Sequence, residues 1–388
     1  MSKLEKLIQQ YCPDGVEYKT LGEVTIMKRG TSATKGIMQA GNIPVISGGR
    51  QPAFYCNASN RTGEVITVAG SGAGAGYVQY WNEPIFVCDA FSIQGNETLN
   101  TKYVYYVLTS IQEKIYSTKK GGGVPHVHIS SIDKFEIPLP PLPVQEEIVR
   151  VLDAFTELQA ELQAELQAEL QKRKQQYNFY CNKLLNHFPE NNDVKEYFVG
   201  QLASFSYGYT SKAENNGPIR YIRITDINEK GFLNPDNAKF IPYSQDVKPY
   251  ILNKNDIVMA RTGATFGKTL LFNEDYPAAY ASFLIKISLN DKVNPRYYWH
   301  FSKSSKYWEQ ANRLVGGGAQ PQFNTKAISQ IKIMLPPLEE QNRIVAILDR
   351  FDTLTNDLTQ GLPAEIEKRR QQYEFYRDKL LTFKRKEA

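Results

Sequence analysis

The longest regular hydrophobic pattern in the chain lies between Val144 and Leu185. This stretch contains no proline and no glycine, and its apolar side chains recur every three or four residues. These side chains are Ile148, Leu152, Phe155, Leu158, Leu162, Leu166 and Leu170. The spacing predicts an amphipathic helix of about 40 residues, which at 1.5 Å per residue spans roughly 60 Å.

A four-residue unit, Glu-Leu-Gln-Ala, repeats from Glu157 to Gln171 within this predicted helix. All of its residues form helices readily. A period of four advances the helix by about 400°, so the leucine row drifts by only about 40° per unit and stays on one face for several turns. The tract is either an ordinary coiled-coil spacer or a ruler, in which each added unit lengthens the helix by about 6 Å without altering its ends.

The chain also contains a tandem duplication. The block Leu-Pro-Pro-Leu at Leu139, with the Gln…Ile-Val…Leu-Asp…Phe pattern after it, returns 196 residues later at Leu335. At the same offset, Lys-Arg-Lys-Gln-Gln-Tyr-Asn-Phe-Tyr from Lys172 matches Lys-Arg-Arg-Gln-Gln-Tyr-Glu-Phe-Tyr from Lys368. Between these blocks the two halves differ in sequence and in length. A shared helical scaffold therefore flanks two different globular bodies.

The duplication predicts a second long helix from about Leu338 to Leu381, with a kink or weak point at Gly361 and Pro363. A long amphipathic helix exposes an apolar stripe that needs a partner, and its own duplicate is the natural one. The N-terminal Leu-Glu-Lys-Leu-Ile from Leu4 resembles the end of the second helix. We therefore expect the end of the chain to pack near its beginning, with the two long helices antiparallel.

Outside the helices, short strands broken by glycine, asparagine and proline indicate a mixed α/β (α+β) fold in each body. We predict a first globular domain over residues 1–143, a first spacer helix over 144–186, a second globular domain over 187–337 and a second spacer helix over 338–388. The two globular domains are thus separated by two long antiparallel helices that form a coiled coil, with an internal pseudo-two-fold duplication.

Composition narrows the classes of protein without selecting one. The net charge of +5 and the pI near 8.7 allow a polyanionic partner but do not require one. The four cysteines are scattered without metal-type spacing, which favours free thiols in a reducing cytosol. The start of the chain lacks an apolar segment and no run approaches about 18 apolar residues, so we expect a soluble, cytoplasmic protein.

Two glycine-rich loops are the most informative chemical features. Gly70–Ala75 follows a strand-like stretch, as in a dinucleotide-binding motif, but the residues after it suggest another strand instead of the required helix. Gly263–Thr269 is one residue short of the phosphate-binding P-loop spacing. Both loops follow equivalent strands. A glycine-rich turn lets the backbone approach a phosphate and arginine can pair with guanine, although a plain hairpin with surface charge explains the loops equally well.

We select as candidate DNA contacts the basic and polar side chains at matched places in the two halves. In the first half they are Lys28, Arg29, Lys35, Arg50, Ser71, Lys119, Lys120, His126 and His128. In the second half they are Tyr207, Tyr209, Lys212, Arg220, Arg223, Arg261, Thr262, Thr265, Lys268, Arg313, Gln320 and Gln322.

Catalysis and metal binding are not expected of this chain. The two histidines of the first half suggest a metal, but their counterparts, Gln322 and Asn324, would not hold zinc. No methyltransferase tetrad, hydrolase triad or helicase motif is present in the sequence. We therefore predict no catalytic residue, no metal site and no cofactor in this chain.

These features together resemble the HsdS family of Type I specificity subunits. The resemblance rests on the duplicated Leu-Pro-Pro-Leu blocks, the paired Lys-Arg…Gln-Gln-Tyr…Phe-Tyr ends and the four-residue tract. The opening Cys-Pro-Asp-Gly-Val-Glu-Tyr at Cys12 and the Gly-Ala-Thr-Phe-Gly-Lys loop at Gly263 also fit. It covers essentially the whole chain, but the recognition bodies vary freely in this family, so its contact residues do not carry over. The tract occurs only in the first helix, which leaves the symmetry of the helices open.

The resemblance implies a non-catalytic subunit in which each target-recognition domain reads one half of a bipartite, asymmetric DNA target and the helices set the gap. It also implies two methyltransferase subunits, which use S-adenosylmethionine, and two restriction subunits, which use ATP and Mg²⁺, as partners. No membrane partner is expected. Three other classes stay open: a coiled-coil adaptor that binds protein, an enzyme that binds nucleotides at the glycine loops, and a specificity subunit of a fused-nuclease system.

The duplicated scaffold implies the same docking surface twice, for two identical partners. The candidates for this surface are Tyr177, Phe179, Tyr180, Tyr373, Phe375 and Tyr376. Packing of the two long helices on each other explains these aromatic residues equally well.

Overall fold

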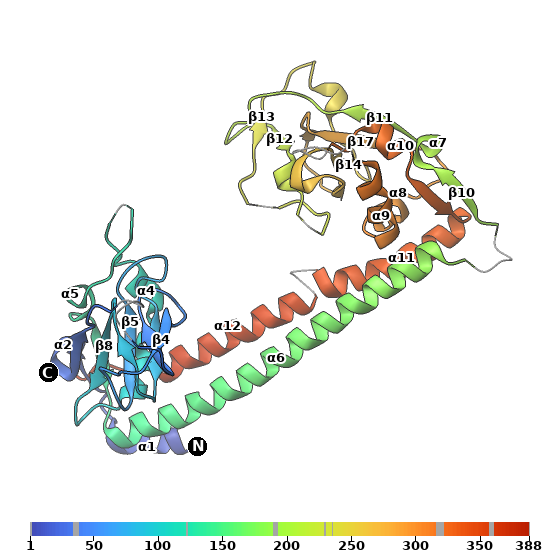
Figure 1. Cartoon of the computed structure of the whole chain (residues 1–388). Coiled ribbons are helices and arrows are strands. Elements are labelled where there is room, and N and C mark those ends of the chain that lie inside the picture. The colour runs from blue at the N-terminus through green and yellow to red at the C-terminus, as the bar shows by residue number, and fades with distance from the viewer. Residues whose placement is uncertain are drawn as a thin grey trace. The chain divides into compact units, whose positions relative to one another are not determined.

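The computed structural model describes residues 2–33, 39–121, 123–188, 193–228, 230–234, 236–315, 322–356 and 361–387. The chain forms two compact units (Figure 1). Unit 1 comprises Met1–Ala164 with Glu367–Ala388, and unit 2 comprises Glu165–Ile366. Each unit therefore contains one globular body together with the helix ends that pack on it. Two predicted DNA contacts, Lys35 and Gln320, lie outside the described residues.

The first long helix is confirmed as α6, which runs without interruption over Leu142–Asn186. The second helical segment consists of two helices, α11 (Leu338–Asn356) and α12 (Leu362–Leu380). α12 begins directly after Gly361, and its second residue is Pro363. Proline is tolerated in the first turn of a helix, where its missing N–H is not needed, but not in the interior. The predicted weak point is therefore the start of a separate helix.

In unit 1 the beginning of α6 runs antiparallel to α12, as predicted. The rings of Phe155 and Tyr376 lie with their centroids 6.4 Å apart. The hydroxyl oxygens of Thr156 and Tyr373 lie 2.9 Å apart. Residue numbers thus rise along one helix while they fall along the other.

The end of the chain packs on its beginning in unit 1, which confirms the predicted closure. The N–H of Val16 donates to the carbonyl of Lys384 at 2.9 Å, and the N–H of Lys386 donates to the carbonyl of Val16 at 2.9 Å. Leu4 and Leu381 share one apolar core with the start of α6. The two ends of the chain therefore hold one body together.

Unit 1 contains a mixed α/β body. Its short helices are α1 (Lys3–Tyr11), α2 (Leu21–Val24), α3 (Thr101–Ser110), α4 (Gln112–Tyr116) and α5 (Ile129–Ile132). Its strands are β1 (Glu17–Thr20), β2 (Thr25–Arg29), β3 (Ile43–Ile46), β4 (Phe54–Cys56), β5 (Val65–Ala69), β6 (Val78–Trp81), β7 (Phe86–Val87), β8 (Ala90–Gly95) and β9 (Glu136–Leu139). They form a four-stranded sheet in the order β2-β8-β5-β6, a three-stranded sheet β4-β3-β7 and the pair β1-β9.

The body of unit 2 has the same sheets in the same order: β11-β17-β14-β15, β13-β12-β16 and the pair β10-β18. These strands are β10 (Lys195–Phe198), β11 (Ala203–Tyr207), β12 (Ile219–Ile222), β13 (Phe240–Ile241), β14 (Ile257–Ala260), β15 (Thr269–Leu271), β16 (Ala278–Tyr280), β17 (Leu284–Leu289) and β18 (Lys332–Leu335). The helices are α7 (Val199–Leu202), α8 (Pro295–Phe301), α9 (Ser305–Leu314), α10 (Thr325–Ser329), and the 3-10 turns η1 (Ile224–Asp226), η2 (Lys248–Tyr250) and η3 (Gly263–Thr265). The two dissimilar halves therefore share one topology.

One inner strand of each four-stranded sheet is buried along its whole length. These strands are β5, with the sequence Val-Ile-Thr-Val-Ala, and β14, with the sequence Ile-Val-Met-Ala. A short run of apolar residues without polar alternation is the pattern of a strand covered on both faces. Because both glycine-rich loops leave the ends of these strands, each loop starts from a point fixed in the core.

Candidate nucleic-acid interface

In unit 1 the glycine-rich loop that leaves β5 is held by backbone contacts with two other segments. The N–H of Gly70 donates to the carbonyl of Asp89, and the N–H of Val127 donates to the carbonyl of Gly70, both at 3.0 Å. Ser71 forms a β-bridge with His126. We call these five residues the loop frame of unit 1. It brings together three segments that lie far apart in the sequence.

Unit 2 contains the same loop frame with different residues. The N–H of Arg261 donates to the carbonyl of Phe283 at 3.1 Å, and the N–H of Phe323 donates to the carbonyl of Arg261 at 2.8 Å. Thr262 forms a β-bridge with Gln322. Each of these residues takes the place of one residue of the first frame. Arg261 stands where unit 1 has a glycine, and Phe283 stands where unit 1 has an aspartate.

Each loop also closes through a glycine in the same way. The N–H of Gly76 donates to the carbonyl of Ala69, and the N–H of Gly267 donates to the carbonyl of Ala260, both at 2.8 Å. The two glycines have φ angles of +83° and +76°, a conformation that other residues rarely adopt. A Cβ atom on Gly267 would also lie 3.0 Å from the ring of Trp308. The predicted equivalence of the two loops is therefore confirmed.

The loop frame of unit 1 lines a surface hollow of about 370 Å³. The polar side chains around this hollow include Arg29, Asp89, His126 and His128. The hydroxyl of Ser71 donates to the carboxylate of Asp89. The imidazole rings of the two histidines stack with their planes 2° apart and their centroids 6.0 Å apart. The hollow thus offers hydrogen-bond donors beside a carboxylate acceptor.

Arg261 dominates the loop frame of unit 2. Its guanidinium carbon lies 5.2 Å from the ring centroid of Tyr207 and 5.4 Å from that of Phe283, within the range of cation–π attraction. Its Nε donates to the carbonyl of Ser282 at 3.2 Å. Tyr207 and Phe283 expose 44% and 52% of their surfaces. The guanidinium therefore lies beside two exposed rings, and its terminal amino groups make no hydrogen bond to any residue that the structure describes.

The other predicted contacts of unit 1 surround the frame or lie outside it. Lys120 exchanges two backbone hydrogen bonds with the frame histidine, at 2.8 and 2.9 Å. The guanidinium of Arg50 lies 5.1 Å from the ring centroid of Tyr77, at the end of the glycine loop. Lys28 is exposed on β2 and Lys119 is partly exposed after α4, and neither belongs to the frame.

In unit 2 the predicted residues divide in a similar way. Those in or beside the glycine loop are Tyr207, Thr262, Thr265, Lys268 and Gln322. Tyr209, Lys212 and Arg313 lie outside the frame. Of these three, Lys212 and Arg313 are exposed, whereas Tyr209 is partly buried against Tyr250 with ring centroids 5.3 Å apart.

Arg220 and Arg223, which were also selected as candidate DNA contacts, make contacts within the body of unit 2. Arg220 is only 7% exposed, and its Nη2 donates to the carbonyl of Asn234 at 3.0 Å. Arg223 donates to both carboxylate oxygens of buried Asp226, at 2.8 and 3.1 Å, and this hydrogen bonding raises the pKa of Arg223. Removing one partner of such a pair would leave a buried charge uncompensated. Loss of either member of the Arg223–Asp226 pair is therefore expected to destabilise the body.

Asp89 and Phe283 are not among the residues predicted from the sequence. Asp89 comes directly before β8, which pairs with β5, and Phe283 comes directly before β17, which pairs with β14. The sequence alone does not specify these strand pairings. Their place in the loop frames follows from this pairing, since about 20 residues separate each of them from its loop. One signal was available, because both residues precede the longest strands of their bodies.

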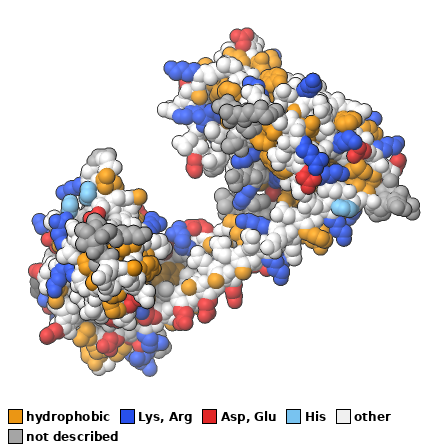
Figure 2. Space-filling view, in the orientation of Figure 1, with side chains coloured by type: hydrophobic (Ala, Val, Ile, Leu, Met, Phe, Trp, Pro, Cys, Tyr) orange, Lys and Arg blue, Asp and Glu red, His pale blue; other side chains and the backbone are white. Residues whose placement is uncertain are grey.

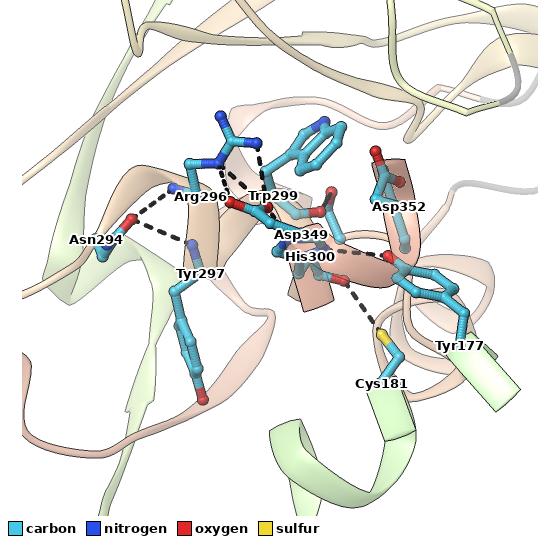
Figure 3. A network of polar contacts seen from close by, with 11 residues as sticks. Tyr177, Cys181, Asn294, Arg296, Tyr297, Trp299, His300, Asp349 and Asp352 are labelled. Atoms are coloured by element: carbon cyan, nitrogen blue, oxygen red, sulfur yellow. Dashed lines mark hydrogen bonds and ion pairs between the residues drawn. The ribbon is translucent and has the colours of Figure 1, made fainter. Parts of the chain in front are cut away.

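A polar network fixes the long helices to the body of unit 2 (Figure 3). His300 of α8 is fully buried, with its Nε2 2.8 Å from Oδ1 of Asp349 and its Nδ1 3.1 Å from the hydroxyl of Tyr177. Arg296 lies 2.9 Å from the same carboxylate. Burial lowers the pKa of His300 despite this partner. Burial acts to raise the pKa of Asp349, but hydrogen bonds from His300 and Arg296 outweigh it, so that its pKa is lowered.

Unit 1 uses the equivalent aspartate for the same purpose. Asp153 and Asp349 occupy the same place in the duplicated Leu-Asp block. The hydroxyl of Tyr106 donates to Asp153 at 2.6 Å, and the amino group of Lys102 lies 2.8 Å from that carboxylate. Tyr106 thus stands where unit 2 has the buried histidine. One duplicated carboxylate anchors each body to its helix.

The predicted docking residues separate into two groups. Tyr177 bonds the buried histidine and Tyr373 bonds a threonine of α6, so both serve packing within their units. Phe179 and Phe375, by contrast, expose 60% and 63% of their surfaces. Each packs edge-on against the tyrosine that follows it, with ring centroids 5.3 and 5.5 Å apart. Two equivalent aromatic pairs therefore remain at the surface.

Lys and Arg side chains are not confined to the loop frames (Figure 2). Figure 2 shows Lys and Arg side chains spread over both units among apolar and neutral ones. Within the described ranges, no group of three or more His, Cys, Asp or Glu side chains is placed to hold a metal ion. In the same part of the chain, no helix combines the length and the apolar character needed to cross a membrane.

Comparison with known proteins identifies relatives along the whole chain. The Type I restriction modification DNA specificity domain matches twice, over residues 13–172 and 191–368. The chain is 34% identical to a putative type I restriction enzyme specificity subunit of Haemophilus influenzae, over 98% of each chain. It is 30% identical to the EcoR124I/EcoR124II specificity subunit of Escherichia coli, over 100% of this chain and 98% of that one.

Solved structures with low sequence identity share the fold. A chain from a study of complex assembly and conformational transition in a type I restriction–modification system matches with a TM-score of 0.65 and 17% identity, over 95% of this chain and 98% of that one. The HsdS subunit of Thermoanaerobacter tengcongensis matches with a TM-score of 0.52 and 17% identity, over 96% and 97%. The predicted mixed α/β fold with a duplicated domain is confirmed.

Proposed function

Because the chain belongs to the Type I restriction–modification DNA specificity family, we propose that each of its units reads one half of a bipartite, asymmetric DNA target. The loop frame is the observation that carries this proposal, since it occurs in each unit with the same backbone hydrogen bonds and different side chains. A common backbone presents both loops to DNA in the same manner, while the side chains decide which base edges are accepted. Unlike side chains therefore correspond to unlike half-sites.

The helical scaffold sets the number of base pairs between the half-sites. α6 is one uninterrupted helix, and the four-residue tract at 157–171 lies inside it. A helix changes length by about 1.5 Å for each residue added or removed, whatever the rest of the chain does. The tract can therefore alter spacing without altering either loop frame.

The duplicated scaffold also docks the catalytic partners. The exposed aromatic pairs that begin at Phe179 and Phe375 occupy equivalent positions on α6 and α12, which suits two copies of one methyltransferase subunit. Two restriction subunits complete the complex. Catalysis belongs to these partners: adenine N6 methylation with S-adenosylmethionine, and DNA cleavage with ATP and Mg²⁺. The complex works in the cytoplasm of a bacterium or archaeon.

The experiment that tests this function is a single-molecule methylome of cells that express this chain with its methyltransferase subunit. The expected result is a new methyladenine motif made of two unlike half-sites around a fixed gap. Cells that express the methyltransferase subunit alone are the control and should lack the motif. If the complex assembles and no new motif appears, the proposal fails and a protein-binding adaptor becomes the better account.

A further inference from the structure

The two loop frames differ in charge at the positions where their backbones coincide. Unit 2 carries Arg261 where unit 1 has Gly70, and unit 1 carries Asp89 where unit 2 has Phe283. We infer that Arg261 reads a guanine in one half-site and that Asp89 reads a base with an amino group, cytosine or adenine, in the other. This inference rests on the proposed function and adds to it the chemistry of the bases that are recognised.

The surroundings of Arg261 orient its guanidinium as a two-pronged donor. The rings of Tyr207 and Phe283 lie on it at 5.2 and 5.4 Å, and its Nε is already engaged with a backbone carbonyl at 3.2 Å. Rotation of the planar group is thereby restricted, and Nη1 and Nη2 remain as the donors. Guanine presents two acceptors, O6 and N7, on its major-groove edge, which a planar arginine fork meets with two hydrogen bonds.

The exposure of the two rings favours a base over a phosphate as the partner of Arg261. Tyr207 and Phe283 expose 44% and 52% of their surfaces, so apolar ring walls stand beside the donors. A base edge placed against these walls loses its water, and hydrogen bonds in such a setting are stronger. A phosphate can also accept the planar arginine fork with two hydrogen bonds, but its charge keeps it hydrated, so it gains less than a base edge from apolar walls.

Asp89 offers the opposite chemistry at the frame of unit 1. Its carboxylate accepts a hydrogen bond from Ser71, and the backbone contact with Gly70 fixes the segment that carries it. A carboxylate repels phosphates, so its attractive partner on DNA is a base amino group. In the major groove these donors are N4 of cytosine and N6 of adenine.

The other charged and titratable groups at the hollow allow this carboxylate to approach DNA. Arg29, His126 and His128 line the hollow of about 370 Å³ together with Asp89. The arginine supplies a positive charge and the imidazoles supply donors, which suit the phosphates on either side of a base. The carboxylate of Asp89 thus lies among hydrogen-bond donors, and a base that pairs with it needs an exocyclic amino group.

The test compares methylomes of cells that express the methyltransferase complex with the wild-type chain or with R261Q, R261K, D89N or K254Q. Arg261→Gln removes the charge and the fork, whereas Arg261→Lys keeps the charge and removes only the fork. Asp89→Asn keeps the shape of the side chain, removes its charge and replaces one oxygen acceptor by an NH2 donor. Lys254→Gln is the matched control, because it changes the net charge as R261Q does. Lys254 forms an ion pair with Asp275 and precedes β14, whereas the glycine-rich loop follows that strand.

The expected result is a separate effect on each half-site. R261Q and R261K should both relax the preference for one guanine by about 5- to 150-fold and leave the other half-site unchanged. D89N should relax or change a cytosine or adenine position in the other half-site only. K254Q should reproduce the wild-type motif. Thermal unfolding of each purified chain verifies that the variants fold.

Several results would overturn the inference. A uniform loss of methylation in R261Q that R261K restores, with the motif unchanged, would make Arg261 a phosphate contact. An affected position without guanine, or changes from R261Q and D89N in the same half-site, would also contradict it. These failures leave a bipartite wild-type motif in place, whereas its absence in wild-type cells would refute the proposed function itself.

Discussion

Removing one Glu-Leu-Gln-Ala unit, residues 161–164, is expected to shorten the gap of the DNA target and to leave both half-sites intact. The unit lies inside α6, which is continuous over Leu142–Asn186. Both glycine-rich loops lie outside α6, so no residue of a loop frame is touched. Because the neighbouring units have the same sequence, the deletion joins two identical segments.

The size of the effect follows from helix geometry. Four residues correspond to about 6 Å of helical rise and about 400° of rotation, so the distal end of the helix turns by a net 40°. A base-pair step is about 3.4 Å along the duplex, so the expected change is about one or two base pairs. The cost in stability should be small, since the leucine of the next unit takes the place of Leu162, which is only partly buried.

A methylome of cells that express the deletion variant with the methyltransferase subunit measures both quantities at once. Insertion of one extra unit should lengthen the gap by the same amount. Leu162→Ala serves as the control, because it perturbs the tract without changing its length and should leave the gap as it is. A deletion variant with altered half-sites and an unchanged gap would refute the view that α6 measures spacing.

Three further predictions concern docking, pH and the loop turn. Phe179→Ala and Phe375→Ala should each weaken the binding of one methyltransferase subunit by about 5- to 30-fold, as measured by native mass spectrometry, without changing thermal unfolding. Unchanged stoichiometry and affinity would contradict the proposed docking surface. Burial lowers the pKa of His300 below its ordinary 6.5, so the unfolded state binds more protons and stability falls as the pH drops below about 6.5. His300→Tyr, which copies Tyr106 of unit 1, should remove this loss in unfolding experiments between about pH 5 and 8; an unaltered pH profile would exclude this histidine as the source. In denaturant unfolding, Gly267→Ala should lower the free energy of unfolding by about 1–2 kcal/mol because of its positive φ, and further because of the close contact with Trp308. Gly263→Ala, with φ +70° and no atom within 4 Å, should lose only the cost of the positive φ, about 1–2 kcal/mol. Equal losses in the two variants would show that the contact is unimportant.

The scaffold could be predicted from the sequence because its signals are local or repeated. Apolar spacing of three and four residues without proline or glycine specifies α6, and Pro363 marks where a helix can begin but not continue. The offset of 196 residues revealed the duplication, and with it the correspondence of Asp153 to Asp349 and of Phe179 to Phe375. These inferences need no knowledge of which strands pair.

The candidate site could be predicted only in part. The glycine loops and Arg261 were recognised, since glycine and arginine at matched positions stand out in a sequence. The burial of Arg220 was not foreseen, because a basic residue on a four-residue strand gives no sign that both faces of the strand are covered. Phe283 was overlooked, because an aromatic residue in a strand-rich body is more often core than surface.

The sequence by itself determined the helices, the duplication, the family and the two glycine turns, because each depends on residues that are close together or on the comparison of one half with the other. Only the tertiary structure decided which side chains meet at the loop frames. Asp89 reaches Gly70 through the pairing of β8 with β5, and Phe283 reaches Arg261 through the pairing of β17 with β14. The physical reason is that strand order and register are set by burial of the whole body, so residues distant in the chain become neighbours without any local pattern that records it.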